Sequence, residues 1–183
     1  MPALKKIALL ALAAAAPGLA LAQACPGDAS PRAAGTLLTV QGAGPATLAL
    51  DAAALAALPQ ATLTQRQSVT SSVTSNSGTA DERRLAYGGV LLRELLTRAG
   101  LDAARDRGAR VAVVEAVATD NYRAVFTWGE LFNTTVGEQV IVIATQDGQP
   151  LDAAAGPLAL RSLADLRPGP RHVRNLCAVI VRR

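Results

Sequence analysis

The sequence predicts an α+β domain in which a mixed, barrel-like β-sheet carries a few short helices. Short apolar runs recur along the chain and are separated by Gly, Pro, Asn and Asp turn signals. A single segment, residues 91–99, has clear helical spacing of its leucines, and strand-like and helix-like segments interleave with no internal linker. Hydrophobic residues make up 50% of the composition and charged residues 17%, which excludes a disordered chain and favours a sizeable core.

The first 24 residues are predicted to be an export signal. Lys5 and Lys6 precede an apolar run, residues 7–16, that is too short for a permanent membrane span. Small residues permit cleavage after Ala22 or Ala24, while a retained anchor helix or lipidation of Cys25 are the alternatives. We therefore expect a signal at 1–24, an N-terminal extension at 25–34 and one domain at 35–183, in a periplasmic or secreted protein.

Removal of the signal changes how charge and cysteine content are interpreted. The chain has a net charge of +4, but its only lysines lie in the signal, so the exported part carries 16 arginines against 14 acids. A net charge of +2 does not predict nucleic-acid binding. An oxidising compartment permits a disulfide between Cys25 and Cys177. A buried Cys177 with a free or lipidated Cys25 is the other interpretation.

The N-terminal half is expected to hold short strands and two helices. Asp51 is a good N-cap for an alanine-rich helix that Pro59 ends, and Gly100 suits the C-terminal end of the leucine-rich helix. The Ser- and Thr-rich segment 68–84 is either a surface loop or a two-stranded excursion. The elements expected in order are strands at 36–41 and 46–50, a helix at 52–58, a strand at 61–67 and a helix at 91–99.

The C-terminal half is expected to be mainly strands. Thr127 and Glu130 form a capping-box pattern that predicts a short helix after the second strand. Asp120 lies in a turn between two strands, where its carboxylate suits an Asx-turn. The predicted strands are 110–118, 122–126, 140–145, 158–163 and 175–182, and residues 167–170 (RPGP) form a loop.

Several enzyme classes lack their usual motifs in this sequence. There is no Gly-rich phosphate loop, no Gly-x-Ser-x-Gly elbow and no His-Glu-x-x-His pattern. One histidine and two cysteines are too few for a zinc finger or an iron–sulfur cluster built from this chain alone. Nucleotide hydrolysis, serine hydrolysis and common metal sites are therefore not expected.

The richest polar cluster is Arg167, Arg171, His172 and Arg174, in a loop that enters the last strand. Arginine guanidinium groups are fork-shaped donors that suit phosphate and other dianions. In the alternative interpretation these are surface arginines paired with Asp165 or Asp152.

Five segments follow one another in an order that is typical of a known protein family. Residues 87–100 combine an aromatic residue, a Gly-Val pair, spaced leucines and a final Ala-Gly. Residues 120–122 (DNY), 147–151 (DGQPL), 156–160 (GPLAL) and 171–176 (RHVRNL) follow, and the last of these enters the final strand. Together they resemble the oxidoreductase molybdopterin-binding domain of the sulfite oxidase type, whose motifs include Asp-Gly-Tyr, Asn/Asp-Gly-x-Pro-Leu and Gly-Pro-x-Arg-Leu. The resemblance covers residues 35–182.

The resemblance implies a molybdopterin-type cofactor, and it also shows a departure. Catalytic members hold molybdenum through a cysteine thiolate soon after the strand that matches 61–67. Here Gln65, Arg66, Gln67 and Ser68 occupy that place, with no cysteine. Amide and hydroxyl groups do not reproduce a soft thiolate ligand, so the usual oxo-transfer chemistry lacks its metal ligand.

Two functional hypotheses follow. In the first, the protein is an exported oxidoreductase-like component that binds a molybdopterin-type cofactor or a similar small anionic ligand and works with a membrane or periplasmic redox partner. In the second, it is a cofactor-free module that keeps the fold and binds another small anion or a protein partner. The binding pocket is expected between the 68–84 and 167–174 segments. The candidate cofactor-binding residues of the first hypothesis are Gln65, Arg66, Arg167, Arg171, His172 and Arg174.

Overall fold

The computed structural model describes residues 25–26, 29–69, 81–101, 107–167 and 169–183. The predicted signal, its two cleavage sites and the tip of the 68–84 segment lie outside the described residues. Within the described part, no helix is long and apolar enough to cross a membrane.

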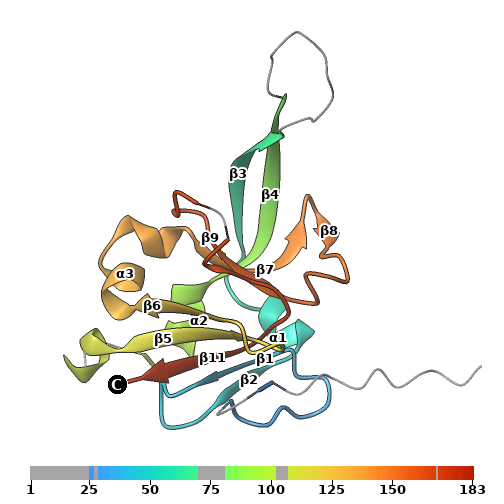
Figure 1. Cartoon of the computed structure of the whole chain (residues 1–183). Helices are drawn as coiled ribbons and strands as arrows, with labels where there is room; N and C mark the ends of the chain where they lie inside the picture. Colours follow the sequence, from blue (N-terminus) through green and yellow to red (C-terminus); the bar gives the residue numbers. More distant parts are fainter. Residues whose placement is uncertain (1–24, 27–28, 70–80, 102–106, 168) are drawn as a thin grey trace, which may run out of the picture.

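A five-stranded sheet contains both ends of the domain (Figure 1). The first strand, β1 (Leu38–Gln41), runs parallel to the last strand, β11 (Leu176–Arg182), and the other pairings in this sheet are antiparallel. Its order is β2-β1-β11-β5-β6, with β2 at Leu48–Leu50, β5 at Val113–Ala118 and β6 at Arg123–Thr127.

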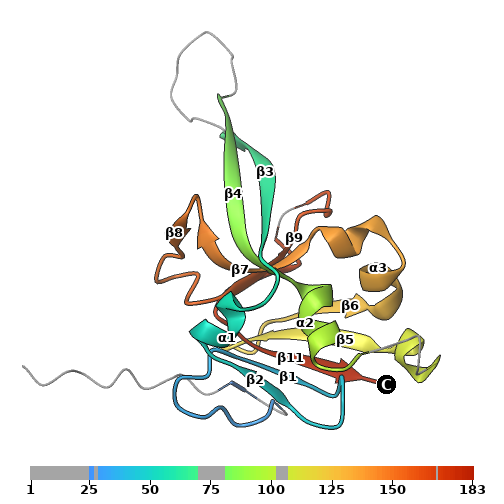
Figure 2. The same ribbon diagram turned by 180° about the vertical axis from the view of Figure 1, so that it is seen from behind.

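A six-stranded antiparallel sheet forms the second layer. Its two longest strands, β3 (Ala61–Val69) and β4 (Asp81–Leu91), form a hairpin that extends away from the rest of the fold (Figures 1 and 2). This confirms the two-stranded alternative for the polar excursion as far as the described residues go. The sheet order is β10-β9-β7-β4-β3 with β8 beside β7, where β7 is Val140–Gln146, β8 Gln149–Pro150, β9 Ala159–Ser162 and β10 His172–Val173.

The helices are short, and two of them, the first and the third, begin with the caps that the sequence predicts. The Asp51 carboxylate accepts a hydrogen bond from the Ala54 backbone N–H at 2.7 Å at the start of α1 (Ala52–Ala56). Thr127 and Glu130 form the expected capping box of α3 (Trp128–Phe132). The remaining helices are α2 (Leu92–Arg98) and two 3₁₀ turns, η1 (Arg107–Val111) and η2 (Thr135–Glu138). Residues 110 and 111, expected in a strand, belong to η1.

The α+β class is confirmed, but the barrel-like closure is wrong. Both sheets are open, ending at β2 and β6 in one case and at β10 and β3 in the other. A barrel requires its first and last strands to pair, whereas β3 here pairs with β4 only and leaves the body with it. Composition and strand spacing contain no information on that closure.

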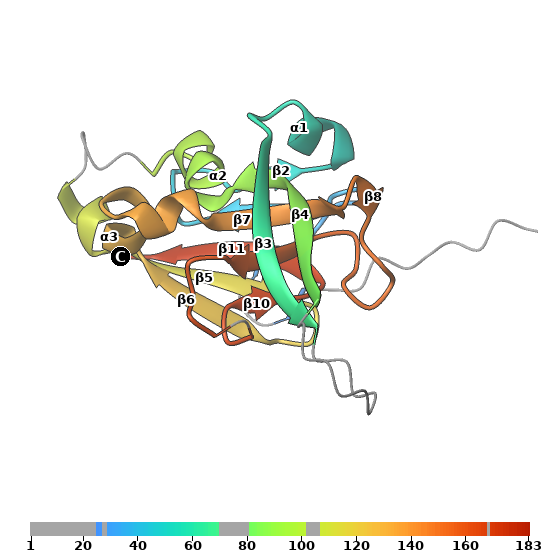
Figure 3. The same cartoon turned by 90° about the horizontal axis from the view of Figure 1, so that it is seen from above.

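The main core lies between the two sheets and the helices, and it is built from residues such as Leu38, Leu95, Phe126 and Val142. A smaller apolar cluster, which includes Tyr87, Ile143 and Ala159, covers another face of the six-stranded sheet. In Figure 3 β10 lies beside β6. Each is an edge strand of its own sheet, so the two sheets meet along these edges.

The N-terminal extension packs on the outer face of the five-stranded sheet. Cys25 and Ala29 contact a small cluster that contains Ala178 and Ile180. Cys25 and Cys177 form a disulfide, with Cα atoms 5.7 Å apart, which confirms the first of the two interpretations of the cysteines. The bond joins positions 152 residues apart and ties the extension to β11.

Candidate functional site

The candidate site starts from a pair of basic side chains on neighbouring strands. His172 on β10 lies directly opposite Arg161 on β9 in an antiparallel ladder. Directly opposed residues in such a ladder project to the same face of the sheet. The two side chains therefore share the face that also carries Tyr87, from β4.

Arg161 is buried, with only 9% of its surface exposed. Its Nη1 donates a hydrogen bond to the Tyr87 hydroxyl at 2.6 Å, and its guanidinium carbon lies 5.4 Å from the centre of the Tyr87 ring. Its Nε–H is buried without a hydrogen-bond partner, and no ion pair joins Arg161 to a carboxylate among the described side chains. Buried charges in proteins are normally paired, so Arg161 is an exception that calls for an explanation.

Arg161 lines a cavity of about 130 Å³, which we call the Arg161 cavity. Tyr87, His172 and Arg174 also line it, together with one carboxylate, Asp152. The Asp152 carboxylate accepts a hydrogen bond from the Ala155 backbone N–H at 2.7 Å and so stabilises its own turn. Apolar side chains complete the wall, and they include Ile143, Leu151 and Ala159.

A second, more open cleft of about 310 Å³ lies on the other side of the same basic residues. His172 and Arg174 line both spaces, and Asp120, Tyr122 and Gly169 complete the cleft. The Tyr122 hydroxyl donates to the Pro170 carbonyl at 2.7 Å, which ties the turn between β5 and β6 to the loop before β10. The cleft therefore connects bulk solvent with His172 and Arg174.

Local turn chemistry holds the walls of the cleft and cavity in place. Asp120 accepts from the Tyr122 backbone N–H at 2.9 Å, as the predicted Asx-turn requires, and Asn121 adopts a positive φ of 69° that asparagine tolerates well. Asn175, directly after Arg174, has a φ of 49° and donates from its side-chain amide to the Ala154 carbonyl at 3.1 Å. These contacts fix the chain on both sides of Arg174.

His172 is half-buried between like charges. Burial is the main cause that lowers the pKa of its imidazole, and the nearby Arg161 and Arg174 charges lower the pKa further. An imidazole with a lowered pKa is neutral at physiological pH. The Arg161 cavity is therefore bordered by two guanidinium charges and one carboxylate, and it carries a net positive charge.

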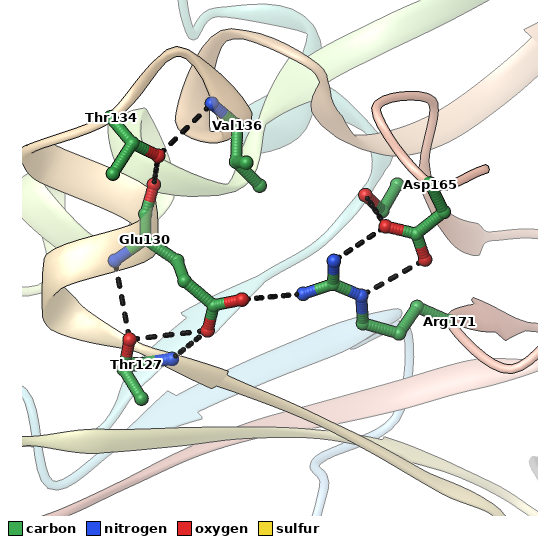
Figure 4. Close-up of polar contacts among 7 residues, drawn as sticks. Thr127, Glu130, Thr134, Val136, Asp165 and Arg171 are labelled. Atoms are coloured by element: carbon green, nitrogen blue, oxygen red, sulfur yellow. Dashed lines mark hydrogen bonds and ion pairs between the residues drawn. The ribbon is translucent and has the colours of Figure 1, made fainter.

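Arg171 lies next to His172 in sequence, but its side chain lies in a different environment (Figure 4). Its guanidinium binds both oxygens of the Asp165 carboxylate and donates through Nη1 to Glu130 at 2.9 Å. Its guanidinium carbon also lies 4.8 Å from the centre of the Phe126 ring. The hydrogen bond to Asp165 is the main cause that raises the pKa of Arg171. We call Arg171, Asp165 and Glu130 the Arg171 cluster.

The six predicted site residues are only partly brought together. His172 and Arg174 share both spaces, while Arg171 is held by two carboxylates and Arg167 is exposed in the loop before β10. Gln65 and Arg66 lie on the hairpin, opposite Leu85 and Arg84, and neither is among the described residues that line the cavity or the cleft. A binding role for each of the six stays a prediction.

Arg161 and Tyr87 are the residues that sequence reasoning missed. Arg161 lies within the apolar run 158–163, which was correctly predicted to form a strand, β9. Its charge was the available signal, because an arginine inside a buried strand needs either a partner or a ligand. Tyr87 belongs to a motif that carries the family resemblance, but its role as hydrogen-bond partner of Arg161 depends on the fold.

The fold is similar to a known structure. The crystal structure of the sulfane dehydrogenase SoxCD from Paracoccus pantotrophus matches with a TM-score of 0.56 and 16% sequence identity. The match covers 79% of this chain and 37% of that chain. At this identity the likeness shows the fold alone, and this chain spans little more than a third of that protein's length. No protein-family model matches the sequence, and no curated protein matches it either.

The residues present do not fit a molybdenum centre of the kind that the family resemblance implies. That centre needs a cysteine thiolate, and both cysteines of this chain are joined in the disulfide. Among the described residues, no group of three or more His, Cys, Asp or Glu side chains is arranged to hold a metal ion. The Arg161 cavity offers hydrogen-bond donors and positive charge, which suit an anion instead.

Proposed function

We propose that this protein is an exported small-anion-binding protein with a sulfite-oxidase-like fold, and that the anion binds in the Arg161 cavity. The observation that carries the proposal is the buried guanidinium of Arg161, which has an Nε–H without a hydrogen-bond partner and forms no ion pair with a carboxylate among the described side chains. An anion at hydrogen-bond distance would supply both the missing acceptor and the missing countercharge.

The energetics favour a bound anion over an empty cavity. Desolvating an ionised side chain costs several kcal/mol when no opposite charge compensates. The hydrogen bond to the Tyr87 hydroxyl and the contact with its ring offset part of that cost for Arg161. A bound oxyanion would offset more, because charge-assisted hydrogen bonds are about twice as strong as neutral ones.

The size of the cavity indicates the class of anion. A volume of about 130 Å³ holds roughly four water-sized groups, if one water occupies about 30 Å³. That room suits an oxyanion with three or four oxygens, such as sulfate, sulfite or phosphate. A larger ligand would have to extend past His172 and Arg174 into the open cleft.

The molybdopterin alternative from the family resemblance keeps one supporting feature, the basic character of the His172 and Arg174 segment. No step of the proposed function passes through molybdenum, because the chain offers no thiolate for it. The proposal also requires no redox partner. The two functions differ in metal content: protein purified from the periplasm of a molybdenum-replete host should contain no stoichiometric molybdenum or pterin. Stoichiometric amounts of both would overturn the cofactor-free proposal.

The binding test uses inorganic sulfate as the probe. In a chloride buffer, calorimetric titration of the exported protein should show one saturable site, and Arg161→Met should weaken sulfate binding at least tenfold. Arg98→Met is a matched control, because Arg98 is an exposed arginine in the last turn of α2 and its loss changes the net charge equally. Equal sulfate affinities of the wild type and Arg161→Met would contradict the proposal.

A further inference from the structure

We infer that the anion and a proton bind together, with His172 taking up the proton when an oxyanion enters the Arg161 cavity. This inference rests on the proposed anion-binding function and deepens it. It makes the protein an acid-favouring anion binder, in which a neutral imidazole becomes a cationic donor only in the bound state.

His172 borders both the Arg161 cavity and the open cleft. It is also the residue opposite Arg161 in the β9–β10 ladder. An anion that enters by way of the cleft would therefore come close to the imidazole before it reaches Arg161. A protonated imidazole has two N–H donors, whereas the neutral ring has one donor and one acceptor. The acceptor nitrogen would repel an oxyanion, and protonation removes that repulsion.

The electrostatic surroundings explain why the proton is absent before the anion binds. Burial and the charges of Arg161 and Arg174 keep the pKa of His172 below its ordinary value in the free protein. A bound dianion opposes the two arginine charges and adds an opposite charge beside the ring, so it raises the pKa of His172. By linkage, the affinity is then highest at low pH and falls as the pH rises through the pKa of the bound state.

Other charged and titratable groups face His172 from each neighbouring element. Arg161 lies on β9 and Arg174 directly follows β10, while the neighbouring Arg171 is neutralised by Asp165 and Glu130. Two carboxylates are also present, because Asp152 lines the cavity and Asp120 lines the cleft. Two tyrosines complete the set: Tyr87, on β4, lines the cavity, and Tyr122, before β6, lines the cleft.

The assignment of the proton is unambiguous in this chain. His172 is the only histidine, and both cysteines are in the disulfide and do not titrate. Histidine is the one side chain whose ordinary pKa lies between about pH 5 and about pH 8. Proton uptake that accompanies sulfate binding near pH 6 therefore reports on His172.

The experiment measures sulfate affinity and proton uptake together. Sulfate is a suitable probe because it stays a dianion over the whole range. Calorimetric titration at about pH 5.5 and about pH 7.5, in two buffers with different ionisation enthalpies, should show at least tenfold tighter binding at the lower pH and uptake of a fraction of one proton. The imidazole NMR signal of His172 should titrate at higher pH with saturating sulfate than without it.

A variant separates proton uptake from simple charge attraction. His172→Gln keeps a polar side chain that cannot be protonated, so the ratio of its affinities at the two pH values should fall to about one. Sulfate binding by the wild type with equal affinity at both pH values and no proton uptake would overturn this inference and leave the anion site standing. Absence of sulfate binding at every pH would overturn the proposed function as well.

Discussion

Arg161 and Arg171 belong to neighbouring residue pairs at the β9–β10 edge of the sheet, but their surroundings are opposite. Arg161 on β9 faces Tyr87 and a cavity, with no carboxylate partner among the described side chains. Arg171 comes directly before β10, where its carbonyl accepts from the Ser162 backbone N–H at 3.2 Å, and it binds two carboxylates. Side chains alternate between faces along a strand. That alternation places the two guanidinium groups on different sides of one sheet edge.

The difference distinguishes a structural cation from a candidate binding cation. In the Arg171 cluster, the charge of Arg171 is balanced by two carboxylates of the protein itself. These carboxylates have further hydrogen bonds, because Asp165 also accepts from the Ser162 hydroxyl at 2.7 Å and Glu130 also caps α3. The cluster therefore joins α3 to the β9–β10 loop without needing a ligand. Arg161 has its charge satisfied only in part, and that incomplete satisfaction is what makes it a candidate binding group.

The largest expected change in the free energy of unfolding comes from the disulfide between Cys25 and Cys177, which lies apart from both arginines. Replacing both cysteines in Cys25→Ser/Cys177→Ser opens a loop of 152 residues and should lower the free energy of unfolding by about 2–5 kcal/mol. Sulfate affinity should stay unchanged, because neither cysteine lines the Arg161 cavity. Denaturant unfolding and calorimetric titration measure the two quantities. A loss of sulfate affinity with intact stability would contradict the separation of the two regions.

The next effect concerns stabilisation by sulfate, which should depend on Arg161 and not on Arg171. At a sulfate concentration about 100 times the Kd, the free energy of unfolding of the wild type should rise by about 2.7 kcal/mol. The Arg171→Met variant should show a similar rise from its lower starting value. Arg161→Met should show only the general stabilisation that sulfate gives to any folded protein. Equal rises in Arg161→Met and the wild type would remove the contrast between the two arginines.

Without any anion, replacement of Arg171 should lower the free energy of unfolding more than replacement of Arg161. Arg171→Met leaves Asp165 and Glu130 without their partner, and because the cluster is partly exposed we expect a loss of about 2 kcal/mol. Arg161→Met removes a buried charge without a carboxylate, so its free energy of unfolding should be close to that of the wild type or higher. Urea unfolding in sulfate-free buffer measures both. A larger loss for Arg161→Met than for Arg171→Met would show that Arg161 has the structural role.

The smallest expected effect is the acid dependence of the Arg171 cluster. Burial raises the pKa of Asp165, but hydrogen bonds from Arg171 and Ser162 outweigh it, and the pKa lies below its ordinary value. Burial likewise raises the pKa of Glu130, and hydrogen bonds from Thr127 and Arg171 more than compensate. Groups with a lowered folded-state pKa stabilise the protein above their unfolded pKa, and this contribution is lost as the pH falls through the folded pKa.

The window for this acid effect lies below about pH 4, where carboxylates titrate. Asp165→Asn should therefore flatten the fall in stability below about pH 4 by an amount on the order of 1 kcal/mol or less, since the cluster is partly solvated. Denaturant unfolding at a series of pH values measures it. Asp152→Asn is the control, because Asp152 has no part in the cluster. A steeper fall in Asp165→Asn than in the wild type would contradict this account of the cluster.

Local features of the fold were predictable from sequence, and long-range ones were not. The Asp51 cap, the Thr127–Glu130 capping box and the Asx-turn at Asp120 depend on residues within a few positions of each other, and all are confirmed. The disulfide was one of two interpretations, because its partners are 152 residues apart. The open sheets, in place of a barrel, depend on how distant strands pair.

The candidate site shows the same limit. His172 and Arg174 were predicted as binding residues because they lie in a visibly basic segment, and they do line one cavity together. Arg171 belongs to that segment too, and its pair with Asp165 confirms the alternative interpretation for this arginine, whereas its second partner, Glu130, lies 41 residues away. Arg161 was missed because the residues around it in sequence, 153–160 and 162–164, are all apolar or small. Its lack of a carboxylate partner among the described side chains is a property of the folded chain alone.

The most direct test of the central claim is a crystal structure of the protein without residues 1–24, grown in selenate, an analogue of sulfate with anomalous scattering. The account predicts an anomalous peak in the Arg161 cavity, within hydrogen-bond distance of the Arg161 guanidinium and close to His172 and Arg174. It also predicts no peak at the Arg171 cluster. Selenate bound only at exposed arginines, with the Arg161 cavity filled by water or by side chains, would contradict the claim that Arg161 is an anion-binding residue.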